Sequence, residues 1–232
     1  MHVQLDHLVV MADNLTQGVA WCEETLGITP AAGGEHERFG KHNRLFKIAT
    51  PAFPLAYFEI IAVNPDRPLP KGVQNRWFDM DDPVLRAAVK QSPRLIHWVA
   101  STPDIQAARA ALRLQQIDRG PAIACARESA KGTVNWQITV RADGQRLFDG
   151  CLPSLIQWGK PKDIDPMQRH PRNALPRSGV SLQGLSITHP ASAKLQQAFD
   201  ALGLQGVQLQ EGNARLVAKF QTPKGAVLIE SV

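Results

Sequence analysis

The sequence predicts an α+β protein made of repeated βαβββ modules, two of them paired into a cupped mixed sheet and a third at the C-terminal end. The main observation is an order of elements that occurs three times: a short apolar strand, an amphipathic helix, and three further extended segments. A second observation is the helix ending Leu26-Gly27-Ile28, which returns as Leu202-Gly203-Leu204. A chain of 232 residues is long enough for such modules to enclose a substantial core.

The first module is expected to cover residues 1–63. Its first strand is predicted at residues 4–11, where apolar side chains surround a histidine. Asp13 or Asn14 is expected to cap the following helix, and Gly27 to end it in the left-handed conformation that glycine adopts easily. The three strands that complete the module are expected near residues 29–37, 43–50 and 55–63.

The second module is expected to cover residues 94–160. Its first strand is predicted at residues 94–100, in the segment RLIHWVA. Thr102-Pro103 is expected to open a helix that runs to Asp118, because proline is favoured at the first position of a helix. The remaining strands are expected near residues 121–127, 133–141 and 151–158.

Two proline-rich connections separate the modules. Residues 64–93 are predicted to contain a short helix that begins with Asp81 or Asp82 and Pro83. We interpret the basic residues 161–179 as a solvated linker rather than a nucleic-acid-binding patch, because no known nucleic-acid-binding motif accompanies them. The basic residues in and beside this linker are Lys160, Lys162, Arg169, Arg172 and Arg177.

The third module, residues 180–232, is shorter than the others. Pro190 is expected to open its helix and Gly203 to end it. Gly184 stands where the first strand of the first module carries His7, so we expect this module to be structural. It would cover the open sheet or contribute to a subunit interface. Its strands are expected near residues 181–189, 206–210, 214–221 and 225–231.

The composition favours a cytoplasmic globular protein. Hydrophobic residues make up 44% and charged residues 20% of the chain, and no apolar run approaches the roughly 20 residues that cross a bilayer. Residues 1–30 lack a signal-peptide pattern, and the three cysteines form no CxxC pair, which indicates a reducing compartment. We expect a small-molecule substrate and neither a nucleic-acid nor a membrane partner. A homodimer would cover the sheet surface that an odd number of modules leaves open.

His7 and Glu59 are the first two candidates for a functional site. His7 lies in the middle of an apolar strand, and Glu59 is a carboxylate inside the apolar segment YFEIIAV. An ionised carboxylate in such surroundings is costly unless a cation or a hydrogen-bond donor meets it. Each residue alone also fits a structural role, as a single histidine on an apolar strand often has. Their repetition in the second module is what favours a site.

In the second module His97 occupies its strand as His7 does, and Gln157, in SLIQWG, is placed at the position of Glu59. Two imidazoles and one carboxylate suit one divalent metal ion of the transition series, namely Fe, Mn, Ni or Zn. Gln157 offers an oxygen that would be a weak fourth ligand or would orient a metal-bound water. The sequence therefore predicts a metal site made of His7, Glu59, His97 and, weakly, Gln157.

Substrate-binding candidates are less specific. His42 and Asn43 lie near the start of a predicted strand, where Asn43 equally fits the role of fixing a turn. Arg127 is a candidate anchor for an anionic substrate, with a surface role as the alternative. His42, Asn43 and Arg127, together with Asn135, are the substrate-binding residues that the sequence predicts.

Asn135 belongs to a strand with alternating polarity, TVNWQITV. Asn135, Gln137 and Thr139 share one face, which we expect to line the cavity, while Trp136 and Ile138 face the helices. A polar face turned toward solvent explains the same alternation.

With these motifs the sequence resembles the vicinal-oxygen-chelate superfamily and, within it, the glyoxalase-like domain family. The resemblance rests on the segments LDHLVVMADNL, GGEHERFGKHNRLFKI, AYFEIIAVNP and LIHWVA, and it covers about residues 3–160. It implies paired βαβββ modules around one metal ion, with His7, His97 and Glu59 as ligands. Gln157 replaces the second acidic ligand of the glyoxalase I arrangement, which leaves a set nearer to the two-histidine, one-carboxylate triad of dioxygenases.

These residues predict a metal-dependent enzyme, a lyase, isomerase or dioxygenase, that acts on a small oxygen-chelating substrate. The ion would stabilise a developing enolate or bind O₂. The first alternative is a metal-free protein that binds or sequesters a small molecule on the same scaffold, as the bleomycin-resistance members of the superfamily do. The second is a purely structural dimer module.

Overall fold

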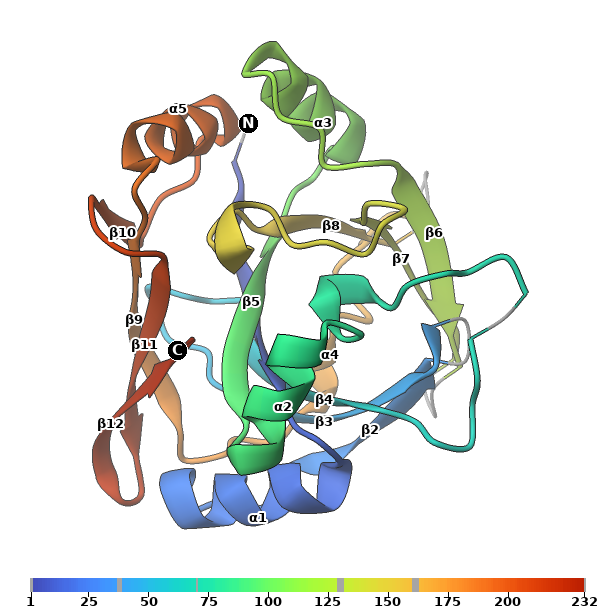
Figure 1. Ribbon diagram of the computed structural model, residues 1–232, viewed down its shortest axis with the longest axis vertical. Helices are drawn as coiled ribbons and strands as arrows, with labels where there is room; N and C mark the ends of the chain where they lie inside the picture. Colours follow the sequence, from blue (N-terminus) through green and yellow to red (C-terminus); the bar gives the residue numbers. More distant parts are fainter. Residues whose placement is uncertain (1, 37–38, 70, 129–131, 160–162, 232) are drawn as a thin grey trace.

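The computed structural model describes residues 2–36, 39–69, 71–128, 132–159 and 163–231, and it consists of two β-sheets with helices around them (Figure 1). Residues 160–162, where the second module was expected to end and the linker to begin, lie outside the described residues. The first module contains β1 (Gln4–Met11), α1 (Leu15–Leu26), β2 (Ala31–His36), β3 (Lys41–Lys47) and β4 (Tyr57–Val63).

The second and third modules repeat this order. The connection before the second module holds a short 3-10 turn (Trp77–Asp79) and helix α2 (Pro83–Gln91). The second module contains β5 (Arg94–Ser101), α3 (Ile105–Leu114), β6 (Ala122–Arg127), β7 (Val134–Thr139) and β8 (Ser154–Trp158), followed by α4 (Pro171–Ala174). The third contains β9 (Ser181–Thr188), α5 (Ser192–Leu202), β10 (Val207–Gln210), β11 (Arg215–Thr222) and β12 (Gly225–Glu230).

The first two modules share one curled sheet of eight strands in the order β2-β3-β4-β1-β5-β8-β7-β6. In both modules the first strand pairs in parallel with the last, β1 with β4 and β5 with β8. The antiparallel pair β1–β5 joins the modules. Strong curvature brings the edge strands β2 and β6 toward each other on the right of Figure 1. The predicted α+β fold with a cupped mixed sheet is therefore confirmed.

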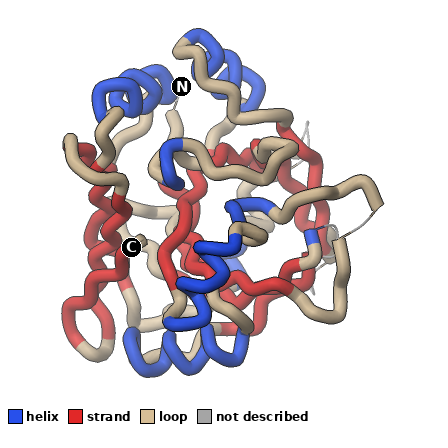
Figure 2. The backbone as a smooth tube through the Cα atoms, in the orientation of Figure 1, coloured by secondary structure: helices blue, strands red, loops and turns tan. Residues whose placement is uncertain are grey.

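The third module forms a separate sheet in the order β10-β9-β11-β12, and Figure 2 shows its strands apart from those of the large sheet. Here, unlike in the first two modules, the first strand does not pair with the last. The tight turn between Thr222 and Gly225 folds β12 back onto β11, on the side away from β9. Strand β9 pairs with β10 and β11 instead.

The small sheet covers the convex face of the large one. Trp98 of β5 meets Phe199 of α5 with ring centroids 6.0 Å apart, and Phe58 of β4 meets Phe220 of β11 at 5.8 Å. Edge-to-face aromatic pairs of this kind stabilise a core beyond the area they bury. The third module thus has the structural, covering role that Gly184 suggested. A second apolar cluster lies on the concave face and forms the walls described below.

The predicted helix caps are largely confirmed, but three helix ends differ from expectation: α3 begins later, α3 ends at Leu114 rather than Asp118, and α5 begins at Ser192 rather than Pro190. Asn14 caps α1, and Gly27 and Gly203 end α1 and α5 in the left-handed conformation, with φ of 75° and 62°. Helix α3 begins after Thr102-Pro103, because the carboxylate of Asp104 accepts two of the first backbone N–H groups. Within the described residues, no helix combines the length and the apolar character needed to cross a membrane.

The connection expected to be a solvated linker is in part a structural element. Its described residues up to Arg169 are largely exposed, but His170 is completely buried and Pro171 starts helix α4 against the concave face. The physical reason is a hydrogen bond between His170 Nε2 and the buried carboxylate of Asp6, 3.1 Å long. This bond draws the connection across the mouth of the cup.

Candidate functional site

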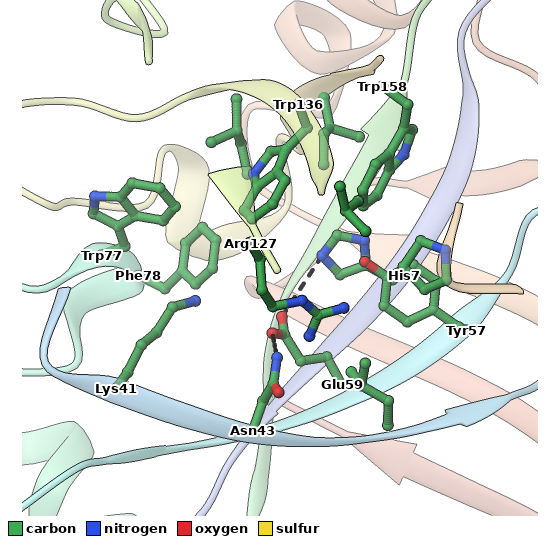
Figure 3. A pocket seen from close by; sticks show the side chains of 15 residues that line it. His7, Lys41, Asn43, Tyr57, Glu59, Trp77, Phe78, Arg127, Trp136 and Trp158 are labelled. Carbon is green, nitrogen blue, oxygen red and sulfur yellow. Dashed lines mark hydrogen bonds and ion pairs between the residues drawn. The ribbon is translucent and has the colours of Figure 1, made fainter. Parts of the chain in front are cut away.

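A pocket opens on the concave face of the large sheet, between the two modules. It encloses about 550 Å³ of space between side chains, part of which is open to solvent. Figure 3 shows its polar side chains gathered at the floor beneath a wall of aromatic rings. The aromatic wall consists of Tyr57, Trp77, Phe78, Trp136 and Trp158, and the polar residues are His7, Lys41, Asn43, Glu59 and Arg127.

A β-bulge in β1 builds the floor. Leu5 pairs with Ala100 and His7 with Val99, so that Asp6 is an extra residue in the β1–β5 ladder. Strict alternation along a strand would place Asp6 on the face opposite to His7, and the bulge breaks that alternation. The His7 Nδ1 atom lies 2.7 Å from Asp6 Oδ1.

The carboxylate of Asp6 is fully buried and accepts three hydrogen bonds. His170 Nε2 and Trp158 Nε1 donate to Oδ2 over 3.1 and 2.8 Å, in addition to the bond from His7. Burial by itself raises the pKa of Asp6, but the charges and hydrogen bonds of His170 and His7 outweigh it and hold that pKa well below its usual range. Asp6 is therefore a carboxylate anion, which accepts hydrogen bonds but cannot donate them.

This arrangement fixes the tautomer of His7. Because Asp6 cannot donate, His7 Nδ1 carries a proton, so that in the neutral form of this imidazole the lone pair lies on Nε2, which faces the pocket. His7 Nε2 lies 3.7 Å from Glu59 Oε2, so the structure brings these two predicted site residues together. Tyr57 stacks on the His7 ring with centroids 4.5 Å apart.

Tyr57 stays a neutral phenol at physiological pH. Burial raises its pKa well above the usual value, and the nearby charges of Asp6 and Glu59 raise it further. A neutral phenol remains a hydrogen-bond donor, so the pocket keeps a polar ring beside His7.

Asn43 positions Glu59 rather than simply fixing a turn. Its Nδ2 donates to Glu59 Oε1 over 2.6 Å, and its Oδ1 accepts from the Gly34 backbone N–H over 2.7 Å. A Cβ atom on Gly33 would lie 2.1 Å from Asn43 Oδ1, so only glycine allows strand β2 to approach this closely. The β2–β3 ladder is correspondingly irregular between Ala32 and Glu35.

Two cations face the pocket without an anionic partner among the described residues. Lys41 is only 4% exposed, and its Nζ lies 5.4 Å from the ring centroid of Trp77 and 5.2 Å from that of Phe78. Arg127 reaches in from the opposite edge strand, β6, and in Figure 3 its guanidinium lies above Glu59. No described residue forms a hydrogen bond or ion pair with either side chain.

The fold and this pocket agree with a comparison of the sequence with known families. The sequence profile of the family described as "Glyoxalase-like domain" matches residues 5–203. The chain belongs to the glyoxalase-like domain family. The match includes every pocket residue named above and all of β9 and α5 in the third module, and it confirms the resemblance found in the sequence.

Solved structures share the fold of this glyoxalase-like domain at low sequence identity. A hypothetical protein from Staphylococcus aureus is 17% identical, with a TM-score of 0.61, over 92% of this chain and 88% of that one. Methylmalonyl-CoA epimerase from Mycobacterium tuberculosis is 18% identical, with a TM-score of only 0.38, over 68% and 89% of the two chains. No curated protein matched the sequence.

The metal site expected of a glyoxalase-like domain is not assembled, because His97 is engaged elsewhere. Its Nδ1 lies 3.1 Å from the Gly150 carbonyl, and its Nε2 accepts the Ser154 backbone N–H over 3.1 Å. The Phe78 ring covers the imidazole, with centroids 4.7 Å apart. His97 therefore has no lone pair to offer toward His7 and Glu59. Within the described residues, no three His, Cys, Asp or Glu side chains form a group suited to a metal ion.

Strand register also corrects the place of Gln157. Val9 pairs with Glu59 across β1 and β4, whereas Val99, its counterpart on β5, pairs with Ser154 of β8. The residue equivalent to Glu59 is thus Ser154, whose hydroxyl lies 3.1 Å from His97 Nε2. Gln157 lies outside the pocket lining, where its Oε1 accepts the Ile105 backbone N–H at the start of α3.

Two of the predicted substrate-binding residues lie outside the pocket lining as well. His42 alternates with Lys41 and Asn43, which do line it, and Asn135 alternates with Val134 and Trp136. The face of β7 that was expected to meet the helices is the face that lines the pocket. The prediction assumed that the polar face of β7 lines the cavity. The pocket is instead lined mainly by aromatic and apolar side chains, so β7 turns its apolar face inward.

Sequence reasoning missed several functional residues. Asp6 precedes His7 directly, and the pair Asp-His in an apolar strand was a usable signal for an oriented imidazole. Lys41 lies directly before His42, which was predicted as a substrate-binding residue although it is Lys41 that lines the pocket. Trp77 and Phe78 come from the long connection between modules, and no local pattern places that connection inside the cup.

Proposed function

We propose that the protein is an enzyme that binds a small organic anion with a flat apolar body and moves a proton at the carbon next to its carbonyl group. The observation that carries this proposal is Lys41, a buried cation that faces the pocket with no anionic partner among the described residues. A buried unpaired charge is costly, so an anionic ligand is the natural complement of Lys41. The aromatic wall beside it suits a planar apolar body.

His7 is the base in the proposed step. A C–H proton passes from the substrate to His7 Nε2, and the electron pair moves to the carbonyl oxygen to give an enolate. Asp6 and Glu59 stabilise the imidazolium that forms, and Lys41 and Arg127 stabilise the negative charge of the substrate. Return of the proton to the substrate completes an isomerisation or an exchange with solvent.

Metal ions have no role in this proposal because the donor set does not fit one. Among the described residues, only His7 Nε2 and Glu59 Oε2 converge, and a catalytic site of this kind ordinarily has three protein ligands. We expect the untagged protein, incubated with Fe(II), Mn(II), Ni(II) or Zn(II) and desalted, to retain no stoichiometric metal by elemental analysis. Metal retained by the wild type and lost in both His7→Ala and Glu59→Ala would restore the metal-dependent function predicted from the sequence.

Lys41→Met tests the anion site. Phenylpyruvate, a planar 2-oxo acid, serves as the probe, and NMR in D₂O measures both its binding and the exchange of its C–H protons beside the carbonyl. We expect the variant to bind phenylpyruvate on the order of 10- to 100-fold more weakly, the loss typical of one charged hydrogen bond. Lys194→Met, at an exposed position of α5, is the matched control and should bind like the wild type.

The same measurements separate the proposal from its rival. Binding that depends on Lys41, together with exchange faster than in protein-free buffer, supports the enzyme. Lys41-dependent binding without faster exchange favours a protein that only binds or sequesters its ligand. Equal binding by Lys41→Met and wild type contradicts the anion site.

A further inference from the structure

The two cations of the pocket, which enter from different strands, have different neighbours (Figure 3). Lys41 lies beside two aromatic rings of the connection between the modules, with its Nζ 5.4 and 5.2 Å from their centroids. The charge of Arg127 acts on Tyr57 instead. Burial raises the pKa of that phenol, nearby carboxylates raise it further, and Arg127 opposes them. Because the Tyr57 ring stacks on His7, Arg127 is the cation at the end of the pocket where the base lies.

Packing against Gly34 sets the position of the Arg127 side chain. A Cβ atom on Gly34 would lie 2.7 Å from Arg127 Nη1 and 2.8 Å from Arg127 Cδ, so the arginine lies directly against the glycine backbone. Arg127 comes from β6 and Gly34 from β2, the two edge strands of the curled sheet. Any side chain at position 34 would take up the space that the arginine now fills.

The backbone of Gly34 also holds the carboxylate beside the base. Its N–H donates to Asn43 Oδ1 over 2.7 Å, and Asn43 Nδ2 donates to Glu59 Oε1 over 2.6 Å. Glu59 Oε2 in turn lies 3.7 Å from His7 Nε2. Gly34 therefore contacts the cation with its Cα and supports the carboxylate with its N–H.

We propose that Arg127 is a catalytic residue that stabilises the enolate oxygen, that Lys41 holds the substrate carboxylate, and that Gly34 is the positioning residue for Arg127. The inference rests on the proposed function. When the C–H proton passes to His7 Nε2, the electron pair moves to the carbonyl oxygen of the neighbouring carbon. Negative charge thus develops close to the base, at the end of the pocket where Arg127 lies. Because the bound substrate lacks this charge, Arg127 contributes to the rate more than to binding.

Arg127→Met tests the catalytic role with phenylpyruvate as the probe. We expect exchange of its C–H protons at saturating phenylpyruvate to slow by about 100-fold, the loss typical of removing one donor to a developing oxyanion. The dissociation constant should change by less than about threefold. Lys41→Met is expected to show the opposite pattern, with its main effect on binding.

Gly34→Ala tests the positioning role, because the added methyl group collides with Arg127. We expect exchange to slow by at least about tenfold with little change in binding. Gly184→Ala, on β9, is the matched control, since a Cβ atom there meets nothing within 4 Å, and it should behave like the wild type. Neither glycine has a positive φ, so alanine causes no backbone strain at either position. Urea unfolding of both variants checks that they fold.

The double variant Gly34→Ala/Arg127→Met shows whether the glycine acts through the arginine. If it does, the double variant exchanges no more slowly than Arg127→Met alone. A further slowing by the same factor that Gly34→Ala causes in the wild type would overturn the positioning role. So would exchange at the wild-type rate by Gly34→Ala.

These measurements separate the inference from the proposed function. If the wild type accelerates exchange and binds in a Lys41-dependent way, but Arg127→Met exchanges as fast as the wild type, the catalytic role is overturned and the proposed function stands. Binding weakened tenfold or more by Arg127→Met, with exchange at saturation unchanged, would also overturn it. If the wild type does not accelerate exchange, the proposed function fails, and the inference fails with it.

Discussion

Lowering the pH below 6.5 is expected to reduce the free energy of unfolding on account of His97, by at most about 1.4 kcal/mol per pH unit for one proton. Burial lowers the pKa of His97 well below 6.5, and the charges of Arg119 and Arg146 lower it further. The folded protein therefore keeps this imidazole neutral where the unfolded chain takes up a proton. The stabilisation is fully present above pH 6.5 and is lost progressively as the pH falls below it.

Urea unfolding between pH 4.5 and 7.5 measures this loss. His97→Asn removes the titrating group, so its unfolding free energy should depend less steeply on pH below 6.5 than that of the wild type. Should the variant not fold, NMR of the histidine C–H signals of the wild type gives the same information, because the His97 signal should not titrate near pH 6.5. A His97 resonance with an ordinary pKa would contradict the neutral, doubly hydrogen-bonded imidazole seen here.

Asp6→Asn is expected to produce the largest loss of function. The amide is neutral and carries two donors, whereas the site presents three donors to Asp6, from His7, His170 and Trp158. The variant leaves buried donors unpaired and no longer fixes the tautomer of His7. We expect proton exchange in phenylpyruvate to slow by about 100-fold or more. The unfolding free energy should fall by about 3 kcal/mol, the loss typical of breaking a buried charged network.

Exchange rates and urea unfolding, measured on the same preparations, separate the two effects. Asp200→Asn, at an exposed position of α5, is the control and should change neither. Trp158→Phe removes one donor but keeps the His7–Asp6 bond, so it should lose about 1 kcal/mol of stability and retain most of the exchange. Exchange by Asp6→Asn within a few-fold of the wild-type rate would show that Asp6 does not orient the base.

The architecture could be predicted from the sequence because short local residue patterns determine where its strands and helices begin and end. Strand periodicity, helix caps and the glycines that end α1 and α5 are each readable from a few neighbouring residues. His7 and Glu59 were found for the same reason: β1 and β4 pair in parallel, and both residues interrupt apolar strands. The arrangement of the third module, whose last strand folds away from its first, was not readable because a tight turn decided it.

The composition of the site, by contrast, depended on contacts between distant segments. The bulge that turns Asp6 toward His7 arises from the pairing of β1 with β5, and the linker residue His170 reaches Asp6 across 164 positions of sequence. A polarity pattern within one strand carries no information about either contact. Nothing in the local sequence marks Lys41 as a site residue, because only the tertiary structure buries its side chain against Trp77 and Phe78.

The sequence by itself determined the repeated modules, their place in the glyoxalase-like domain family, and the facing pair of His7 and Glu59. The tertiary structure decided whether the second histidine could join them. Strand pairing put Ser154, not Gln157, opposite Val99, and the backbone N–H of Ser154 took the lone pair of His97 while Phe78 covered the ring. A residue type offers a ligand atom, but only the neighbours that compete for its lone pair decide whether that atom is free to bind.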